Sequence, residues 1–137
     1  MPHRRISHLV VPAVIGLATI ASAMAIPVAS ASAATSSVNV NARCSGTSVS
    51  NLQVQREDTG KLSVDFGVDM ARHTAGVPWK FVQKDNGTVF ANGIAKTVSD
   101  GSFSVTRLIA PKPGTNTIIA TAKNTLTGET CTIRAAL

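Results

Sequence analysis

Short segments in which polar and apolar residues alternate, separated by glycine-containing turns, constrain the fold of this chain more than any other feature. The clearest is LSVDFGVD at residues 62–69, where every second residue is a large apolar one. This period places the apolar side chains on one face of a β-strand, as in an antiparallel sheet with one buried face. Because no segment after residue 37 keeps a helical period for three turns, we expect an all-β domain.

Turn residues divide this region into short strands. We expect strands at about residues 38–44, 49–56, 62–69, 79–84, 88–90, 102–109, 117–123 and from 131 onward, with a short edge segment at 94–98. The turns between residues 84 and 102 fall at Asn86-Gly87, Asn92-Gly93 and Asp100-Gly101, and Asn86-Gly87 has the composition of a type I′ hairpin turn. Turns at this spacing are typical of a sandwich or barrel.

Trp79 is the largest side chain that such a sandwich must bury. If Ile118, Ala120 and Ala122 point inward, the two alanines leave room for its ring. If these three residues point inward, the side chains of Cys131, Ile133 and Ala135 on the last strand point inward as well. From the strand at residues 102–109 we expect Phe103 and Val105 to point inward, with Leu108 as a third candidate.

The first 33 residues have the pattern of a secretory signal. Arg4 and Arg5 form a positive region, residues 9–20 are apolar, and Ala31-Ser32-Ala33 is a small-x-small cleavage site. We therefore expect residues 1–33 to be a signal peptide and residues 34–137 to form one secreted domain.

Two alternatives for this segment stay open. Cleavage after Ala23 or Ala25 also satisfies the small-residue rule, and the uncharged residues 9–28 are long enough for an uncleaved membrane anchor. Pro12, Pro27 and the Ser/Ala-rich end favour a processed signal, so we expect no stable membrane anchor.

Cys44 and Cys131 are the only cysteines of the chain. In an exported protein two cysteines most simply form one disulfide. Since Cys131 is expected to be buried, Cys44 must lie close to it, which places the first strand beside or across from the last. We expect no metal site, because His73 is the only histidine after the signal segment and no further ligand lies at a suitable spacing.

The charge of the secreted part limits its partners. Without Arg4 and Arg5, eleven Lys/Arg face seven Asp/Glu, a net charge of +4. This balance favours weak attraction to anionic surfaces such as wall polymers. We expect no nucleic-acid binding, because most of the few aromatic residues occupy inward strand positions and no run of five Lys/Arg is present. We also expect no cofactor, and a monomer.

Short motifs at the turns and strand starts of residues 60–137 are typical of a known class of domain. They are Gly60 in a turn, Gly-Val-Pro-Trp at 76–79, Asp-Gly-Ser-Phe at 100–103, and Pro-Gly-Thr-Asn at 113–116 leading into Ile-Ile-Ala-Thr-Ala at 118–122. This pattern resembles bacterial immunoglobulin-like domains of the invasin and fibronectin-III kind, and the small exported bacterial proteins that consist of such a domain alone. The resemblance implies an immunoglobulin-like antiparallel sandwich of seven or eight strands, here with one disulfide.

Two departures from antibody domains are visible. The expected disulfide joins the start of the domain to its end instead of two central strands, and the chain has no tyrosine for a tyrosine corner. An immunoglobulin-like fold hosts many functions, so the resemblance implies a fold and not an activity.

Candidate catalytic residues have simpler interpretations, and we expect no enzyme activity. His73, with Asp69 four residues before it, is interpreted as an exposed loop residue. Asp65 and Asp69, candidates for a glycosidase carboxylate pair, are interpreted as a solvated strand face. Asp85 and Asp100 are interpreted as turn formers, and Asn86-Gly87-Thr88 as a turn although it matches a glycan acceptor pattern.

The outer face of the sheet that contains Trp79 is the candidate binding face. Its outward positions are Lys80, Val82, Lys84, Ile119, Thr121, Lys123, Thr130, Thr132 and Arg134. We hypothesise that Lys80, Val82, Lys84, Ile119, Lys123 and Arg134 bind an anionic cell-envelope polymer or another protein. The alternative is an ordinary charged face that discourages association between sheet edges.

Two further function classes remain as alternatives. The first is a carrier of a small apolar molecule, because enediyne-binding apoproteins are exported immunoglobulin-like sandwiches of similar length, although this chain lacks their two internal disulfides. The second is a protease inhibitor, for which residues 110–115 or 72–78 would be the exposed loop. A non-catalytic binding or structural module outside the cell is the function that we expect.

Overall fold

The structure is a computed structural model that describes residues 36–137. This part of the chain contains eight strands and no helix, so it has no helix able to cross a membrane. The strands are β1 (Ser37–Arg43), β2 (Val49–Arg56), β3 (Leu62–Asp69), β4 (Pro78–Asp85), β5 (Thr88–Lys96), β6 (Ser102–Ile109), β7 (Thr117–Asn124) and β8 (Thr130–Ala136). The predicted all-β class is confirmed. The predicted signal segment, its cleavage sites and the alternative anchor lie outside the described residues.

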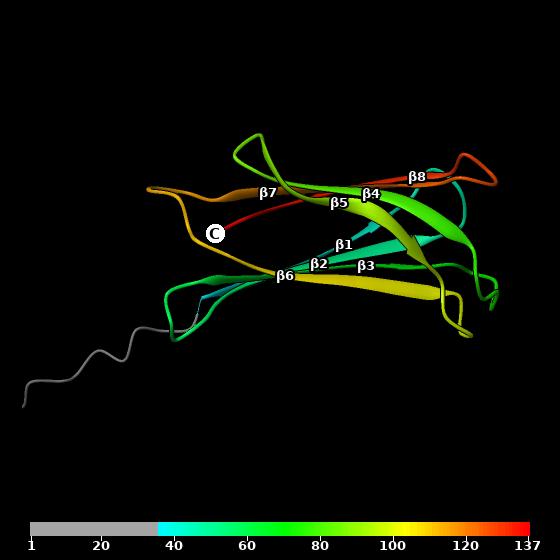
Figure 1. Cartoon of the computed structure of the whole chain (residues 1–137), viewed down its shortest axis with the longest axis horizontal. Helices are drawn as coiled ribbons and strands as arrows, with labels where there is room; N and C mark the ends of the chain where they lie inside the picture. Colours follow the sequence, from blue (N-terminus) through cyan, green and yellow to red (C-terminus); the bar gives the residue numbers. More distant parts are fainter. Residues whose placement is uncertain (1–35) are drawn as a thin grey trace, which may run out of the picture. The chain divides into compact units, whose positions relative to one another are not determined.

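The strands form two antiparallel sheets packed as a sandwich (Figure 1). The first sheet has the order β1-β2-β3-β6 and the second the order β5-β4-β7-β8. The chain changes sheet between β3 and β4, between β5 and β6, and again between β6 and β7. Such crossings between two antiparallel sheets are compatible with an immunoglobulin-like fold.

The core consists of the inward side chains of both sheets. Trp79 is fully buried, and its ring centroid lies 6.0 Å from that of Phe103, which lies 6.2 Å from Phe66. The predicted inward positions on β7 and β8 are all buried: Ile118, Ala120, Ala122, Cys131, Ile133 and Ala135. The register sets Ala122 opposite Phe81 and Ala120 opposite Gln83, whereas Trp79 lies opposite Asn124. The two alanines therefore lie opposite Phe81 and Gln83, and not opposite Trp79 as the expected packing implied.

The predicted disulfide between Cys44 and Cys131 is present, with a Cα–Cα distance of 4.2 Å. Cys44 follows β1 of the first sheet and Cys131 lies in β8 of the second, so the bond joins the two sheets. Of the two predicted arrangements, the first strand therefore lies across from the last. Nearby, the Glu129 carboxylate accepts hydrogen bonds from the backbone N–H and hydroxyl of Ser48, at 2.8 and 2.9 Å.

Two sequence predictions about the strands are wrong. Asn92-Gly93 is not a turn, because β5 continues through it and Gly93 pairs with Phe81. Gly93 lies beside the Phe81 ring, and a Cβ atom there would be 3.4 Å from it, an ordinary van der Waals distance. Leu108 is 62% exposed, because strict alternation from Phe103 and Val105 carries it to the opposite face.

The Asn86-Gly87 turn has the predicted conformation. Both residues have positive φ angles, 47° and 84°, as a type I′ turn requires. The turn joins β4 to β5, which pair directly. It therefore fixes how β5 extends the outer face of the second sheet.

Candidate functional site

The structure brings the predicted binding residues together on the outer face of the second sheet. We call this surface the basic face and define it by the nine outward side chains Lys80, Val82, Lys84, Ile119, Thr121, Lys123, Thr130, Thr132 and Arg134. Three rows cross the strands: Lys80–Lys123–Thr130, Val82–Thr121–Thr132 and Lys84–Ile119–Arg134. The four cationic side chains are exposed, whereas Val82, Ile119 and Thr121 are half-buried.

Strand β5 extends the basic face by residues that the sequence analysis missed. Asn92 lies opposite Val82, Ile94 opposite Lys80, and Lys96 opposite Pro78. Ile94 is 64% exposed and Lys96 is exposed, so a further apolar side chain and a fifth cation adjoin the face. The sequence does contain a signal for these positions, because Asn92, Ile94 and Lys96 alternate with smaller residues. The turn predicted at Asn92-Gly93 interrupted this alternation, so the strand was not recognised.

The charges on this face are all of one sign. Among the described residues, the outward positions of β4, β5, β7 and β8 contain five cations and no carboxylate. Lys80 and Lys123 are direct cross-strand partners. Directly opposed side chains have Cβ atoms about 5 Å apart, at which distance like charges destabilise a sheet. A bound anion would remove this repulsion.

Two shallow depressions lie on the basic face. One, of about 270 Å³, lies over β7 and its neighbours among Lys80, Lys123, Thr130 and Thr132. The other, of about 190 Å³, lies between Lys84 and Ile119. Val82 and Thr121 line both, so the depressions adjoin each other across these two short side chains.

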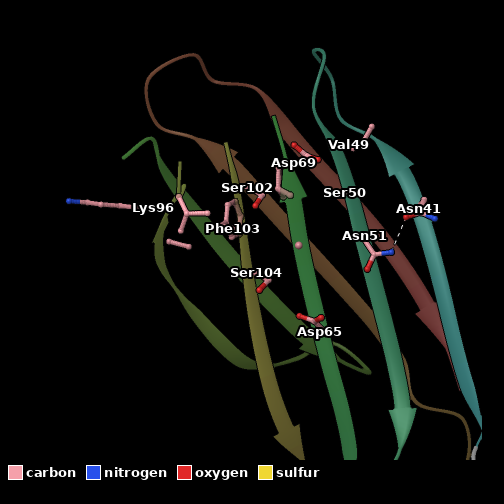
Figure 2. A pocket seen from close by; sticks show the side chains of 14 residues that line it. Asn41, Val49, Ser50, Asn51, Asp65, Asp69, Lys96, Ser102, Phe103 and Ser104 are labelled. Atoms are coloured by element: carbon pink, nitrogen blue, oxygen red, sulfur yellow. Dashed lines mark hydrogen bonds between the residues drawn. The ribbon is translucent and has the colours of Figure 1, made fainter. Parts of the chain in front are cut away.

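A larger depression, about 630 Å³, lies on the outer face of the first sheet and extends to Lys96 at the end of β5 (Figure 2). Its lining mixes polar side chains with apolar ones such as Val49 and Val98. The Asn51 Nδ2 donates to Oδ1 of Asn41 at 2.8 Å and of Asn39 at 2.7 Å. Asp65 accepts a hydrogen bond from the Thr106 hydroxyl at 3.0 Å. These side chains largely satisfy one another, and the face offers no aromatic platform among its outward residues.

The structure does not bring Asp65 and Asp69 together. They lie on the same face of β3 but four residues apart, which at about 3.3 Å per residue separates them by about 13 Å. Glycosidases place their two carboxyl groups about 5 to 9.5 Å apart. Asp65 and Asp69 therefore lack the spacing of a glycosidase pair.

His73 lies in the exposed loop between β3 and β4, as expected. Asp100 forms the predicted turn, because its Oδ1 accepts hydrogen bonds from the Ser102 N–H at 2.8 Å and hydroxyl at 2.6 Å. These bonds, with a smaller contribution from the charge of His73, hold the pKa of Asp100 below its usual value. Within residues 36–137 no three potential metal ligands form a cluster.

Asp85 has a different environment from the one expected. It ends β4 next to the Asn86 turn, but its side chain is buried, and its Oδ1 has no hydrogen-bond partner in the described part of the protein. Burial raises the pKa of this carboxyl, against a smaller opposing effect from the charge of Lys112. The Lys112 ammonium donates to the backbone carbonyl of Asp85 at 2.8 Å.

The loop at residues 110–115, a candidate inhibitory loop, is braced by hydrogen bonds. Buried Asn116 accepts from the Lys112 N–H at 2.8 Å, and the Asn86 side chain donates to the Thr115 carbonyl at 3.1 Å. The long side chain of Lys112, however, is bonded back to Asp85. The loop is therefore held in place but does not present its lysine outward.

No family model, no curated protein and no solved structure matches the chain.

Proposed function

We propose that this protein is a secreted, non-catalytic binding module whose basic face holds an anionic polymer of the cell envelope. The observation that carries the proposal is the set of four exposed cations on the basic face, where the outward positions of the sheet hold no carboxylate. The direct opposition of Lys80 and Lys123 supports it further, because that pair lowers stability until an anion lies between the two charges.

The topology supports the finer resemblance to fibronectin-III and invasin-type domains. Strands β2 to β8 follow the order of immunoglobulin strands A, B, C, C′, E, F and G: β2-β3-β6 corresponds to the sheet A-B-E, and β5-β4-β7-β8 to the sheet C′-C-F-G. Strand β1 is an addition outside A, and it leads into the disulfide cysteine Cys44. The basic face then corresponds to the outer face of the C′-C-F-G sheet.

A secreted location is supported by two observations. Residues 1–33 have the pattern of a signal peptide. The Cys44–Cys131 disulfide is of the kind that persists in oxidising compartments. An anionic envelope polymer is a ligand that a basic protein would meet there.

Retention on purified anionic wall material tests the proposal. We expect the mature protein to be retained at low salt and released as salt rises, because exposed charges are screened over about 8 Å at 0.15 M. The quadruple variant Lys80→Gln, Lys84→Gln, Lys123→Gln and Arg134→Gln should lose retention.

A control with the same change in net charge separates the face from overall basicity. It replaces four exposed cations elsewhere: Arg43→Gln, Lys61→Gln, Arg72→Gln and Arg107→Gln. We expect this variant to keep most of its retention. Equal loss in both variants, or unchanged retention of the first, contradicts a role for the basic face.

A further inference from the structure

The two depressions on the basic face lie in line along β7. The first is lined by Lys123 and Thr121 of this strand, and the second by Thr121 and Ile119. Side chains on one strand face are spaced by two residues, so the depressions follow each other along β7 instead of lying side by side across the sheet. Together they form a shallow channel, which we call the β7 channel.

The β7 channel has cations at both ends and none in the middle. Lys80 and Lys123 flank one end, and Lys84 lines the other, with Arg134 opposite Ile119 on the next strand. Lys80 and Lys84 are four residues apart on one strand, which corresponds to about 13 Å. The middle consists of two short, half-buried side chains, Val82 and Thr121.

We propose that the β7 channel binds a linear polyanion lengthwise along β7. This inference rests on the proposed function and specifies the shape of its ligand. One phosphate or carboxylate group lies between Lys80 and Lys123, a second lies about 13 Å further along, near Lys84 and Arg134, and the uncharged linking atoms pass over Val82 and Thr121. The Arg134 guanidinium can form the bidentate hydrogen bonds that such oxygens accept.

A flat anionic membrane is a different ligand for the same charges. A lipid surface would meet the projecting ends of the lysines and would not reach the channel floor at Val82 and Thr121. A linear chain, in contrast, occupies the floor and engages both ends at once. Once one end is bound, the second binds intramolecularly at a high effective concentration, so affinity depends on chain length.

Linear polyphosphates of graded length are suitable probes, with inorganic phosphate as the shortest. By titration calorimetry at constant ionic strength and constant phosphate-group concentration, we expect weak binding until the chain spans about 13 Å. Beyond that length the affinity should rise by about tenfold or more in one step. Removing either end alone, with Lys80→Gln and Lys123→Gln or with Lys84→Gln and Arg134→Gln, should abolish the step.

A variant that fills the floor separates the channel from general charge attraction. Thr121→Trp changes no charge, and aromatic residues are well accommodated in strands. We expect it to reduce binding of long polyphosphate about tenfold, while retention on vesicles with anionic lipid stays unchanged. The matched control is Asn92→Trp, an exposed position in the same row on β5 that lines neither depression.

The outcomes distinguish this inference from the proposed function. A smooth rise of affinity with chain length, together with no effect of Thr121→Trp, overturns the channel but leaves the basic face as a polyanion site. Equal losses of polyphosphate and vesicle binding in Thr121→Trp also overturn it. If the protein binds no polyanion of any length, the proposed function itself is wrong.

Discussion

At the scale of single residues, Lys80 and Lys123 have the most direct energetic consequence. They are cross-strand partners on an exposed face, with no carboxylate among the outward neighbours on their own strands. Strand pairing usually sets complementary charges opposite each other, since like charges cost free energy. An anion bound between the two ammonium groups would relieve their repulsion, so the pair forms a site at which anion binding is favourable.

We therefore expect Lys123→Gln to raise the free energy of unfolding by about 0.2 to 1 kcal/mol at low salt, while weakening polyanion binding. Urea denaturation measures the first effect, and the gain should shrink as salt rises. Lys61→Gln, at an exposed position before β3, is the control and should leave stability nearly unchanged. A loss of stability in Lys123→Gln would contradict the repulsion.

Asp85 gives the protein a second testable property, a pH dependence of stability. Its folded pKa is raised, so the native state holds the proton more tightly than the unfolded chain, whose value is 3.8. The unfavourable contribution is therefore absent below pH 3.8 and grows as pH rises through the folded pKa. Urea denaturation across this range should show wild type losing stability relative to Asp85→Asn as pH increases; parallel curves would contradict the burial of the charged form.

At the scale of elements, the turns decide how the strands meet. Gly101 links the loop before β6 to the end of β3, since its carbonyl accepts a hydrogen bond from the Met70 N–H at 3.1 Å. It has a φ of 85°, and a Cβ atom there would collide with the Arg72 carbonyl oxygen. Gly114 has a similar φ of 79° but open space around it. The two glycines thus differ in packing and not in backbone conformation.

This difference predicts unequal costs of substitution. Gly114→Ala should destabilise by about 1 to 2 kcal/mol, the cost of a left-handed conformation. Gly101→Ala should cost clearly more, because the β3–β4 loop must also move. Thermal or urea unfolding measures the loss of stability in both variants. Equal losses would show that the loop with the Arg72 carbonyl moves aside at little cost.

The elements also separate what local sequence can and cannot predict. Residues 49–56, 62–69 and 102–109 were predicted with the bounds that β2, β3 and β6 have, because their alternation and flanking turns are local signals. Strand β5 was divided wrongly, because an Asn-Gly pair is a strong local turn signal. In this case pairing of Asn92 and Gly93 with β4 outweighed it.

At the scale of the whole molecule, the disulfide closes the sandwich. Cys44 and Cys131 are separated by 87 positions, so the bond encloses most of the domain and joins one sheet to the other. In the chain-entropy account, a long closed loop removes many conformations from the unfolded state. A domain of this size has only modest stability to lose.

We expect the double variant Cys44→Ala and Cys131→Ala to lower the free energy of unfolding by about 4 to 5 kcal/mol. Alanine is used because Cys131 is fully buried and a serine hydroxyl would need a hydrogen-bond partner there. Urea denaturation of both proteins measures the difference. A loss below about 1 kcal/mol would mean that the unfolded chain without the bond already keeps residues 44 and 131 close together.

The sequence by itself determined the fold class, most strand positions, the disulfide pair and the membership of the basic face, because alternation and turn chemistry act between neighbouring residues. Only the tertiary structure decided that Lys80 stands opposite Lys123, that Ile94 and Lys96 adjoin the same face, and that Asp85 is buried. These features depend on which strands pair and in which register. Strand pairing and register are decided by packing between residues far apart in the chain. A pattern among neighbouring residues contains no information about such contacts.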